Sequence, residues 1–254
     1  MDIPTVADFN AEIERAMKAF QIEITKMINE LSSGGTMAFS SENLRLATDN
    51  YTQMVNLLEQ AGFGDIKKNI IASESATITA FKAFNYPGSV PFKLLAVKDV
   101  PIIAALQDTE LLQLLNLETS VSQAVYSRLV DGVLTGQSTD ESIRLLGKTL
   151  DTQTRYIKTW YETSRQQFEQ KVQDLSAANY KEEFGGGLYW EYIGAPKDDK
   201  TRYECDLALS KLVFTDAEKQ SFETGGMFDA QVPRYNCRHI FWQITERRYK
   251  EMTN

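Results

Sequence analysis

The sequence predicts a predominantly helical α+β protein, in which a helical N-terminal body is followed by a small C-terminal α+β module with a short antiparallel sheet. Two observations predict this fold class. Through most of the first 184 residues, apolar side chains recur at steps of three and four, the spacing of one face of an α-helix. After position 186, two runs rich in aromatic and β-branched residues, 187–193 and 239–244, are typical of strands.

Helical periodicity covers residues 6–31, 41–60 and 65–84, and it resumes from 108 to 134. Glycines at 34 and 35, glycines at 62 and 64, and the Pro-Gly pair at 87–88 are expected to end the first three helices. The stretch from 90 to 100 suits a short β-hairpin or an extended arm. The body is therefore expected to be a set of amphipathic helices.

Two capping boxes mark further helix starts. Ser138 and Glu141 form the first, which opens a helix reaching to about residue 150, and this helix either continues into or is followed by a long polar helix over residues 151–178. Thr215 and Glu218 form the second, which opens a short helix inside the module. Along the long helix, a stripe of large apolar residues is either an oligomer seam or a core-facing stripe: Trp160, Phe168 and Leu175.

Three ranges divide the chain. Residues 1–125 form a helical region of unassigned role, residues 126–184 form long helices, and residues 185–254 form the small α+β module. Glycines 185–187 mark the last boundary. With 43% apolar and 24% charged residues, the composition is that of a folded protein and not of a disordered chain.

The formal net charge is −8, which disfavours tight binding to nucleic acid through the whole surface. The exception is the C-terminal end, where positions 234–250 hold five Lys or Arg residues against one Glu. Arg247, Arg248 and Lys250 are the candidates for contact with a partner or with phosphate. The alternative is a solvated tail, so any DNA contact is expected to be weak.

The sequence gives no sign of a membrane span. The longest apolar stretch, 90–106, is interrupted by two prolines and three charged residues. The N-terminus lacks a basic segment followed by an apolar one, so we expect no secretion signal. In a cytosolic context two cysteines are expected to be thiols or metal ligands and not a disulfide.

The rarest side chains lie close together in the sequence. Both cysteines, Cys205 and Cys237, and the single histidine, His239, fall in the last fifty residues. One interpretation is a zinc site. Its fourth ligand would come from one of three aspartates: Asp198, Asp199 or Asp206.

Two other interpretations stay open. A Cys–His dyad would make the chain an enzyme, although no oxyanion hole is recognisable. A metal-free, close-packed cluster is favoured because the chain has no Cys-x-x-Cys pair. It requires Cys205 to contact Cys237 or His239.

Two arginines flank this cluster in the sequence. Arg202 and Arg238 have the geometry to pair with nearby aspartates and so to hold the two strand-like runs together. The alternative is contact with phosphate or with a partner's carboxylate. For Arg238 the internal pair is favoured, because it alternates with Cys237 and His239 along a predicted strand.

The order of these residues resembles the Mu F-like minor head proteins of tailed bacteriophages, also called head morphogenesis proteins. The likeness covers about residues 126–245. The chain departs from the family pattern at 207–211, where a turn with Asn-Gly or Asp-Gly is usual, and at 233–235, where glycines are usual. Its matching motif residues are Trp190, Asp199, Thr201, Arg202, Cys205, Asn236, Cys237, Arg238 and His239.

The resemblance implies a structural protein of the virion with no cofactor and no enzymatic activity. It would be bound at or near the portal vertex of the phage head in several copies and would act in head morphogenesis, with DNA packaging or ejection as a further role. The portal protein is the expected partner, with scaffold or major capsid protein as additional ones. During assembly it would lie in the host cytoplasm. The alternative function is a small zinc- or cysteine-dependent hydrolase of phage or toxin origin.

Overall fold

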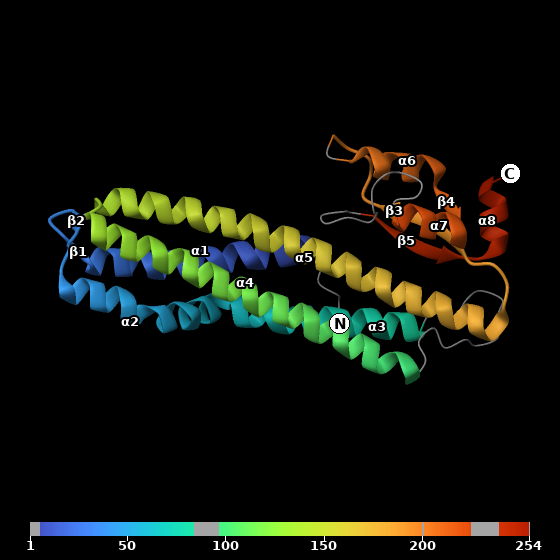
Figure 1. Ribbon diagram of the computed structural model, residues 1–254, viewed down its shortest axis with the longest axis horizontal. Helices are drawn as coiled ribbons and strands as arrows, with labels where there is room; N and C mark the ends of the chain where they lie inside the picture. The colour runs from blue at the N-terminus through green and yellow to red at the C-terminus, as the bar shows by residue number, and fades with distance from the viewer. Residues whose placement is uncertain (1–5, 84–96, 200, 225–238, 254) are drawn as a thin grey trace. The chain divides into compact units, whose positions relative to one another are not determined.

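The computed structural model describes residues 6–83, 97–199, 201–224 and 239–253 (Figure 1). The chain forms two compact units. Unit 1 comprises residues 1–73 and 108–159, and unit 2 comprises residues 74–107 and 160–254, so three long helices contribute to both. The predominantly helical α+β class is confirmed, as is the short antiparallel sheet near the C-terminus. The division into ranges 1–125, 126–184 and 185–254 stays a prediction.

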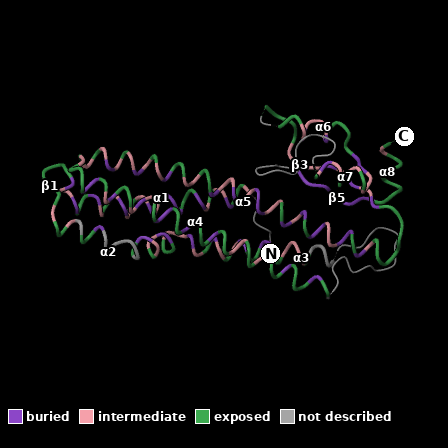
Figure 2. The backbone as a smooth tube through the Cα atoms, in the orientation of Figure 1, coloured by how far each residue is buried: buried purple, intermediate pink, exposed green. Residues whose placement is uncertain are grey.

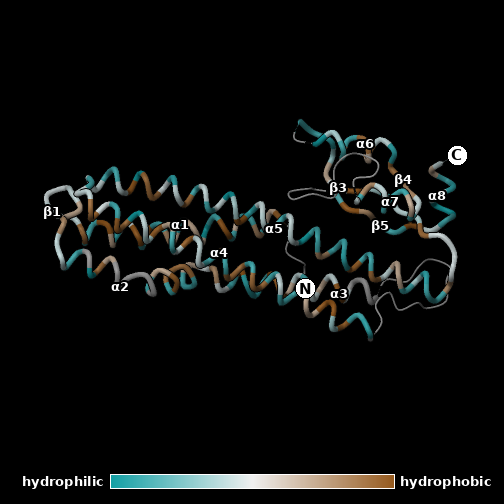
Figure 3. Tube along the Cα trace, in the orientation of Figure 1, coloured by the Kyte–Doolittle hydropathy of each residue, from teal (hydrophilic) through white to brown (hydrophobic). Residues whose placement is uncertain are grey.

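Unit 1 is a set of helices that bury one face each. It contains α1 (Val6–Glu30), α2 (Ser41–Leu58), the start of α3 (Gly64–Ala83), most of α4 (Val100–Thr135) and the first part of α5 (Thr139–Phe184). The face of α1 predicted from the sequence is buried, and Figures 2 and 3 show burial and hydropathy alternating along these helices. Its buried residues are Phe9, Ile13, Ala16, Met17, Phe20, Ile24 and Ile28.

Gly62 interrupts the helix at the predicted place, between α2 and α3. The chain passes from α2 to α3 through a π-helical segment, Glu59–Phe63, in which Gly62 has a φ of +124°. Only glycine adopts this conformation without strain. A Cβ atom at Gly62 would also lie 3.4 Å from the Cβ of Ala16 on α1. The glycine therefore redirects the backbone and lets it approach α1 closely.

A short hairpin joins α1 to α2. Strands β1 (Ser32–Ser33) and β2 (Thr36–Met37) pair antiparallel through the turn at Gly34 and Gly35, which have φ values of +61° and +83°. The hairpin also pairs with the α4–α5 connection, because Thr36 forms an isolated bridge with Ser138. Two segments about one hundred residues apart in the sequence thus meet at one end of unit 1 (Figure 1).

Unit 2 contains the sheet. After η2 (Val97–Asp99) and the second part of α5 come β3 (Tyr189–Gly194), α6 (Tyr203–Lys211), β4 (Val213–Thr215), α7 (Asp216–Glu223), β5 (His239–Ile244) and α8 (Glu246–Thr253). The strand order is β4-β3-β5 and both pairs are antiparallel. The two predicted strand runs are confirmed as β3 and β5. The short strand β4 and the helix α8 did not show in the sequence pattern.

The register of the sheet separates two faces. Trp190 and Tyr192 of β3 stand beside Gln243 and Phe241 of β5 and point to one side. On the other side Trp242 packs with Phe168 of α5, in a second buried cluster. Leu175 packs against that cluster and Trp160 is buried, so the stripe on α5 faces the core of unit 2.

The predicted hairpin or arm at 90–100 lies mostly outside the described residues. From Val97 onward the chain is helical, and α4 begins at Val100, eight residues earlier than the periodicity indicated. Pro101 is tolerated in this first turn because its missing N–H would have no helical partner there. None of the described helices combines the length and apolar character needed to cross a membrane.

Candidate functional site

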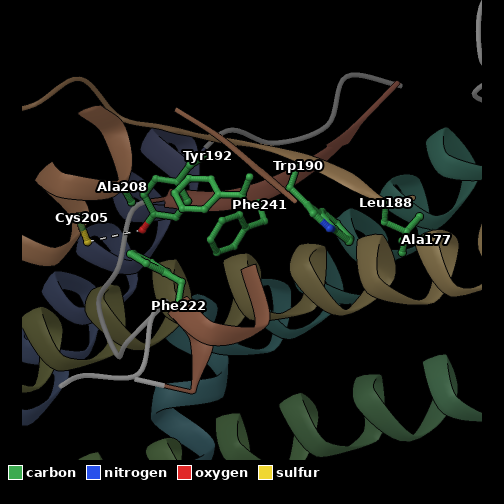
Figure 4. Close-up of a cluster of buried hydrophobic side chains, with 9 residues drawn as sticks. Ala177, Leu188, Trp190, Tyr192, Cys205, Ala208, Phe222 and Phe241 are labelled. Carbon is green, nitrogen blue, oxygen red and sulfur yellow. Dashed lines mark hydrogen bonds between the residues drawn. The ribbon is translucent and has the colours of Figure 1, made fainter. Parts of the chain in front are cut away.

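The C-terminal module is built around an aromatic cluster on one face of the sheet (Figure 4). Tyr192, Phe214, Phe222 and Phe241 are each less than 1% exposed. Their ring centroids lie 4.9 to 6.4 Å apart, mostly at tilted or edge-to-face angles. Such pairs contribute about 0.5–1.5 kcal/mol each beyond the burial of their area. The motif residue Trp190 is also buried in this cluster.

Cys205 and His239 both contact Tyr192 at the centre of this cluster. The Tyr192 hydroxyl donates to Cys205 Sγ at 3.6 Å, drawn as the dashed line in Figure 4. The Tyr192 ring stacks on the His239 ring with centroids 5.4 Å apart. Both motif residues are buried, and Cys205 is a free thiol. Tyr192 therefore links the two rare side chains, one from α6 and one from β5.

The tautomer of His239 follows from its partner. His239 Nε2 lies 2.9 Å from the carbonyl oxygen of Ala195. Because a carbonyl oxygen only accepts, Nε2 must carry the proton and donate. A metal at this histidine would have to bind through Nδ1.

The zinc prediction is not tested by these contacts. Asn236, Cys237 and Arg238 lie outside the described residues, so the predicted contact of Cys205 with Cys237 and the clip made by Arg238 stay predictions. Within the described part of the chain, no group of three or more His, Cys, Asp or Glu residues could hold a metal ion. Cys205 and His239 could bind a metal ion only together with ligands from outside the described residues. Asp199, one of the candidate fourth ligands, is exposed.

Asp198 and Thr201 close a turn before α6, in which the Thr201 N–H donates to Asp198 O at 3.1 Å. Thr201 Oγ1 donates to Asp198 Oδ1 at 3.0 Å and accepts from the Asp198 N–H at 2.9 Å. Arg202 is the N-cap residue of α6 and is exposed. Asp206, in the first turn of α6, pairs with Lys197 at 2.6 Å. The motif residues Thr201 and Arg202 therefore lie at the start of the helix that carries Cys205.

The second predicted capping box is present in full. Thr215 Oγ1 accepts from the Glu218 N–H at 3.3 Å, and Glu218 Oε2 accepts from the Thr215 N–H at 2.9 Å. Burial opposes ionisation of Glu218, but hydrogen bonds from Lys211 and Thr215 outweigh it and lower the pKa of this carboxyl. Ionised Glu218 therefore stabilises the fold above its ordinary pKa, and this contribution is lost as the pH falls through the lowered value.

The first capping box is only half formed. The Glu141 N–H donates to Ser138 Oγ at 3.2 Å, but the Glu141 carboxylate accepts from Arg144 at 2.6 Å. The helix begins where the pattern predicted. Its first turn is completed by an i, i+3 ion pair and not by the reciprocal bond of the box.

A polar network that sequence reasoning missed runs from the sheet edge to α7. The N–H of Phe241 on β5 donates to Gln170 Oε1 at 2.8 Å, and Gln170 Nε2 donates to Asp174 Oδ1 at 3.0 Å. Asp174 also accepts from Lys219 Nζ at 3.1 Å, and Lys219 donates to Glu223 at 2.7 Å. Gln170 of α5 thereby takes a backbone N–H of the edge strand β5 that a further strand could otherwise bind.

Lys219 is the centre of this network. Its side chain is 5% exposed, and its ammonium lies 4.6 Å from the Trp190 ring centroid and 5.4 Å from that of Phe241. Two carboxylates and two aromatic faces thus surround one buried cation. The available sequence signal was the position of Lys219 three residues before Phe222, on the apolar side of a short helix.

Burial raises the pKa of Glu223, and the hydrogen bond from Lys219 only partly offsets it. Ionising Glu223 therefore costs more in the folded protein than in the unfolded chain. Lys219 limits this cost.

The three basic residues predicted to contact a partner or phosphate lie on α8, and each has a carboxylate beside it. Arg248 forms two hydrogen bonds to Glu191 of β3, at 3.0 and 2.8 Å. Arg247 pairs with Glu251 and Lys250 pairs with Glu246, one helical turn away in each case. Tyr249 also packs on Tyr189, with centroids 4.6 Å apart. Phosphate would have to compete with these carboxylates.

The module is thus an aromatic core held by hydrogen bonds from three surrounding helices, and the motif residues described in it are mainly packing and capping residues. This arrangement suits a rigid binding surface. Comparison of the chain with models of protein families, with curated proteins and with solved structures finds no significant match.

Proposed function

We propose that this protein is a minor head protein of a tailed bacteriophage, bound at or near the portal vertex and acting in head morphogenesis. The observation that carries the proposal is the order of motif residues from Trp190 to His239, which resembles that of the Mu F-like minor head proteins. DNA packaging or ejection is a further role that the same position in the head would allow.

The environment of the motif residues supports a structural role. Trp190 donates to Asp216 at 3.3 Å and lies under Lys219, so it joins β3 to α7. Cys205 and His239 join α6 and β5 through Tyr192. Residues used in this way fix the shape of a surface, which is what a subunit of an assembly requires.

We further propose that the protein acts by binding and not by catalysis, without a cofactor. In this proposal the portal protein is the principal partner, scaffold or major capsid protein is an additional one, and contact with DNA is weak. Several copies would be present per virion. A His239→Ala variant should then be less stable than the wild type, and neither protein should show hydrolytic activity. A stable variant that abolishes a measurable hydrolysis by the wild type would favour a zinc- or cysteine-dependent hydrolase.

Quantitative mass spectrometry of purified phage particles tests the proposal. The expected result is that the protein is present at a fixed copy number per particle, far below that of the major capsid protein. Its absence from finished particles, or a copy number that varies between preparations, would contradict a structural role in the head.

A further inference from the structure

Helix α8 has less contact with the core than the other short helices of the module. The structure buries Cys205 and Ala208 of α6, and Lys219 and Phe222 of α7, but it buries none of the residues of α8, which is described throughout. Helices α7 and α8 have the same length, eight residues each. Because an isolated helix of this length is unstable in water, α8 depends on its contacts with the sheet.

One ion pair and one ring contact attach α8 to β3 in the part of the chain that the structure describes. Arg248 Nε and Nη2 donate to Glu191 Oε2 at 3.0 and 2.8 Å, so one carboxylate oxygen accepts both hydrogen bonds. On the next residue, the Tyr249 ring packs on the Tyr189 ring. Tyr249 is half-buried, and 56% of the Arg248 side chain is exposed. Both contacts therefore lie at the surface of the module.

Contacts of this kind are weak. An exposed ion pair changes an equilibrium by about fivefold or less, and salt screens it. An aromatic pair adds a factor of about two to twelve. The other two ion pairs of α8, Glu246 with Lys250 and Arg247 with Glu251, lie within the helix and do not attach it to the sheet. Because ordering eight residues also opposes docking, the docked form should exceed the open form by about 100-fold or less.

We propose that α8 is a salt-sensitive latch, which detaches from the sheet when the Arg248–Glu191 ion pair breaks while the rest of the module stays folded. In the closed form, Glu191 occupies the hydrogen-bonding edge of the Arg248 guanidinium. Opening frees this guanidinium for another anion and uncovers Glu191 and Tyr189 on β3. The latch does not depend on the function proposed for the chain.

Hydrogen exchange of the full chain, followed by mass spectrometry, measures the opening. The amides of α8 should exchange at most about 100-fold more slowly than those of an unfolded peptide. Those of α7, which buries two side chains, should be protected by at least about a further factor of ten. Raising the salt concentration from about 0.05 M to about 0.5 M should speed the exchange of α8 about threefold and leave that of α7 nearly unchanged.

Variants of Glu191 test the role of the ion pair. Glu191→Gln should speed the exchange of α8 about threefold at low salt, and its difference from the wild type should disappear at high salt, where the pair is screened. Glu23→Gln is the matched control, because Glu23 forms an exposed ion pair with Lys26 in unit 1 and should leave α8 unchanged. Glu191→Lys should open the latch further, and adding Arg248→Glu should close it again with the charges exchanged.

The exchange rates distinguish a latch from a fixed helix and from a frayed one. Exchange of α8 as slow as that of α7 would overturn the proposal. Fast exchange that neither salt nor a change at Glu191 alters would also overturn it, because the ion pair would then not hold the helix. If Glu191→Lys unfolds the module, the exchange of α7 will rise with that of α8, and Glu191→Gln then decides.

Discussion

The helical unit and the C-terminal module reach a rigid structure by different routes. Unit 1 buries mainly aliphatic faces of long helices and fixes its end by backbone hydrogen bonds between loops. The module has short elements, and it combines an aromatic cluster with a buried cation and its carboxylates. A small sheet with little aliphatic core therefore depends on aromatic contacts and on a polar network. The module should therefore be sensitive to single changes at a few positions.

Tryptophan fluorescence reports on unit 2, which contains the module. The three tryptophans, Trp160, Trp190 and Trp242, all belong to unit 2. Far-UV circular dichroism reports on the helices of both units. A change that disrupts the module alone should shift the fluorescence transition more than the circular dichroism transition.

The largest effect is expected from Tyr192→Ala. This change removes a fully buried ring that contacts three phenylalanines, His239 and Cys205, so the module should lose about 3–5 kcal/mol. Tyr203→Ala is the matched control, because Tyr203 is 72% exposed, and it should change stability by less than about 0.5 kcal/mol. Equal losses in denaturant unfolding for the two variants would break the comparison.

Lys219→Met should have the next largest effect. Methionine keeps most of the apolar stem but leaves the Asp174 and Glu223 carboxylates without their cation. Because both carboxylates are about one quarter to one third exposed, we expect a loss of about 2 kcal/mol and not the full cost of a broken buried pair. Lys250→Met, at an exposed pair, should have a much smaller effect than Lys219→Met. A Lys219→Met protein as stable as the wild type would show that the network adds little.

Thr215→Ala should cost about 1 kcal/mol, because it removes the N-cap of α7 and half of the capping box. Thr215→Ser keeps the hydroxyl and should be close to the wild type. The two variants are compared by the midpoint of thermal unfolding followed by fluorescence. If serine fails to restore the midpoint, the cap is not the source of the loss.

The smallest expected effect is a change in the pH dependence of stability. The pKa of Glu223 is raised in the folded state above its ordinary value of 4.5, so the folded protein takes up this proton at a higher pH than the unfolded chain. As the pH falls through the raised pKa towards 4.5, the wild type should gain stability relative to Glu223→Gln. The gain should level off below that value. Unfolding titrations of both proteins measure it, and a difference that shrinks on acidification would contradict the assigned direction.

Local patterns predicted much of this structure. The buried face of α1, the start of α7 at Thr215 and the strands β3 and β5 follow from periodicity, capping and composition within short windows. The short strand β4 escaped notice because it has three residues and follows Leu212, whose φ is +66°. The helix α8 was missed because it has no buried residue and therefore no apolar periodicity. Its contact with the sheet, from Arg248 to Glu191, joins residues 57 positions apart in the sequence.

The site was predictable only in part. The sequence pointed to Trp190, Cys205 and His239, but it could not show that Tyr192 lies between the last two. The same limit applies to the polar network: Gln170 and Asp174 lie one turn apart on α5, but Lys219 comes from α7 and the Phe241 N–H from β5. Contacts of this kind depend on tertiary packing and leave no periodic signal in the sequence.

Chemical cross-linking of assembled phage particles, followed by mass spectrometry, tests the proposed function most directly. We expect cross-links between this protein and the portal protein, at a copy number well below that of the major capsid protein. Cross-links only to tail components, or none to any head protein, would contradict it.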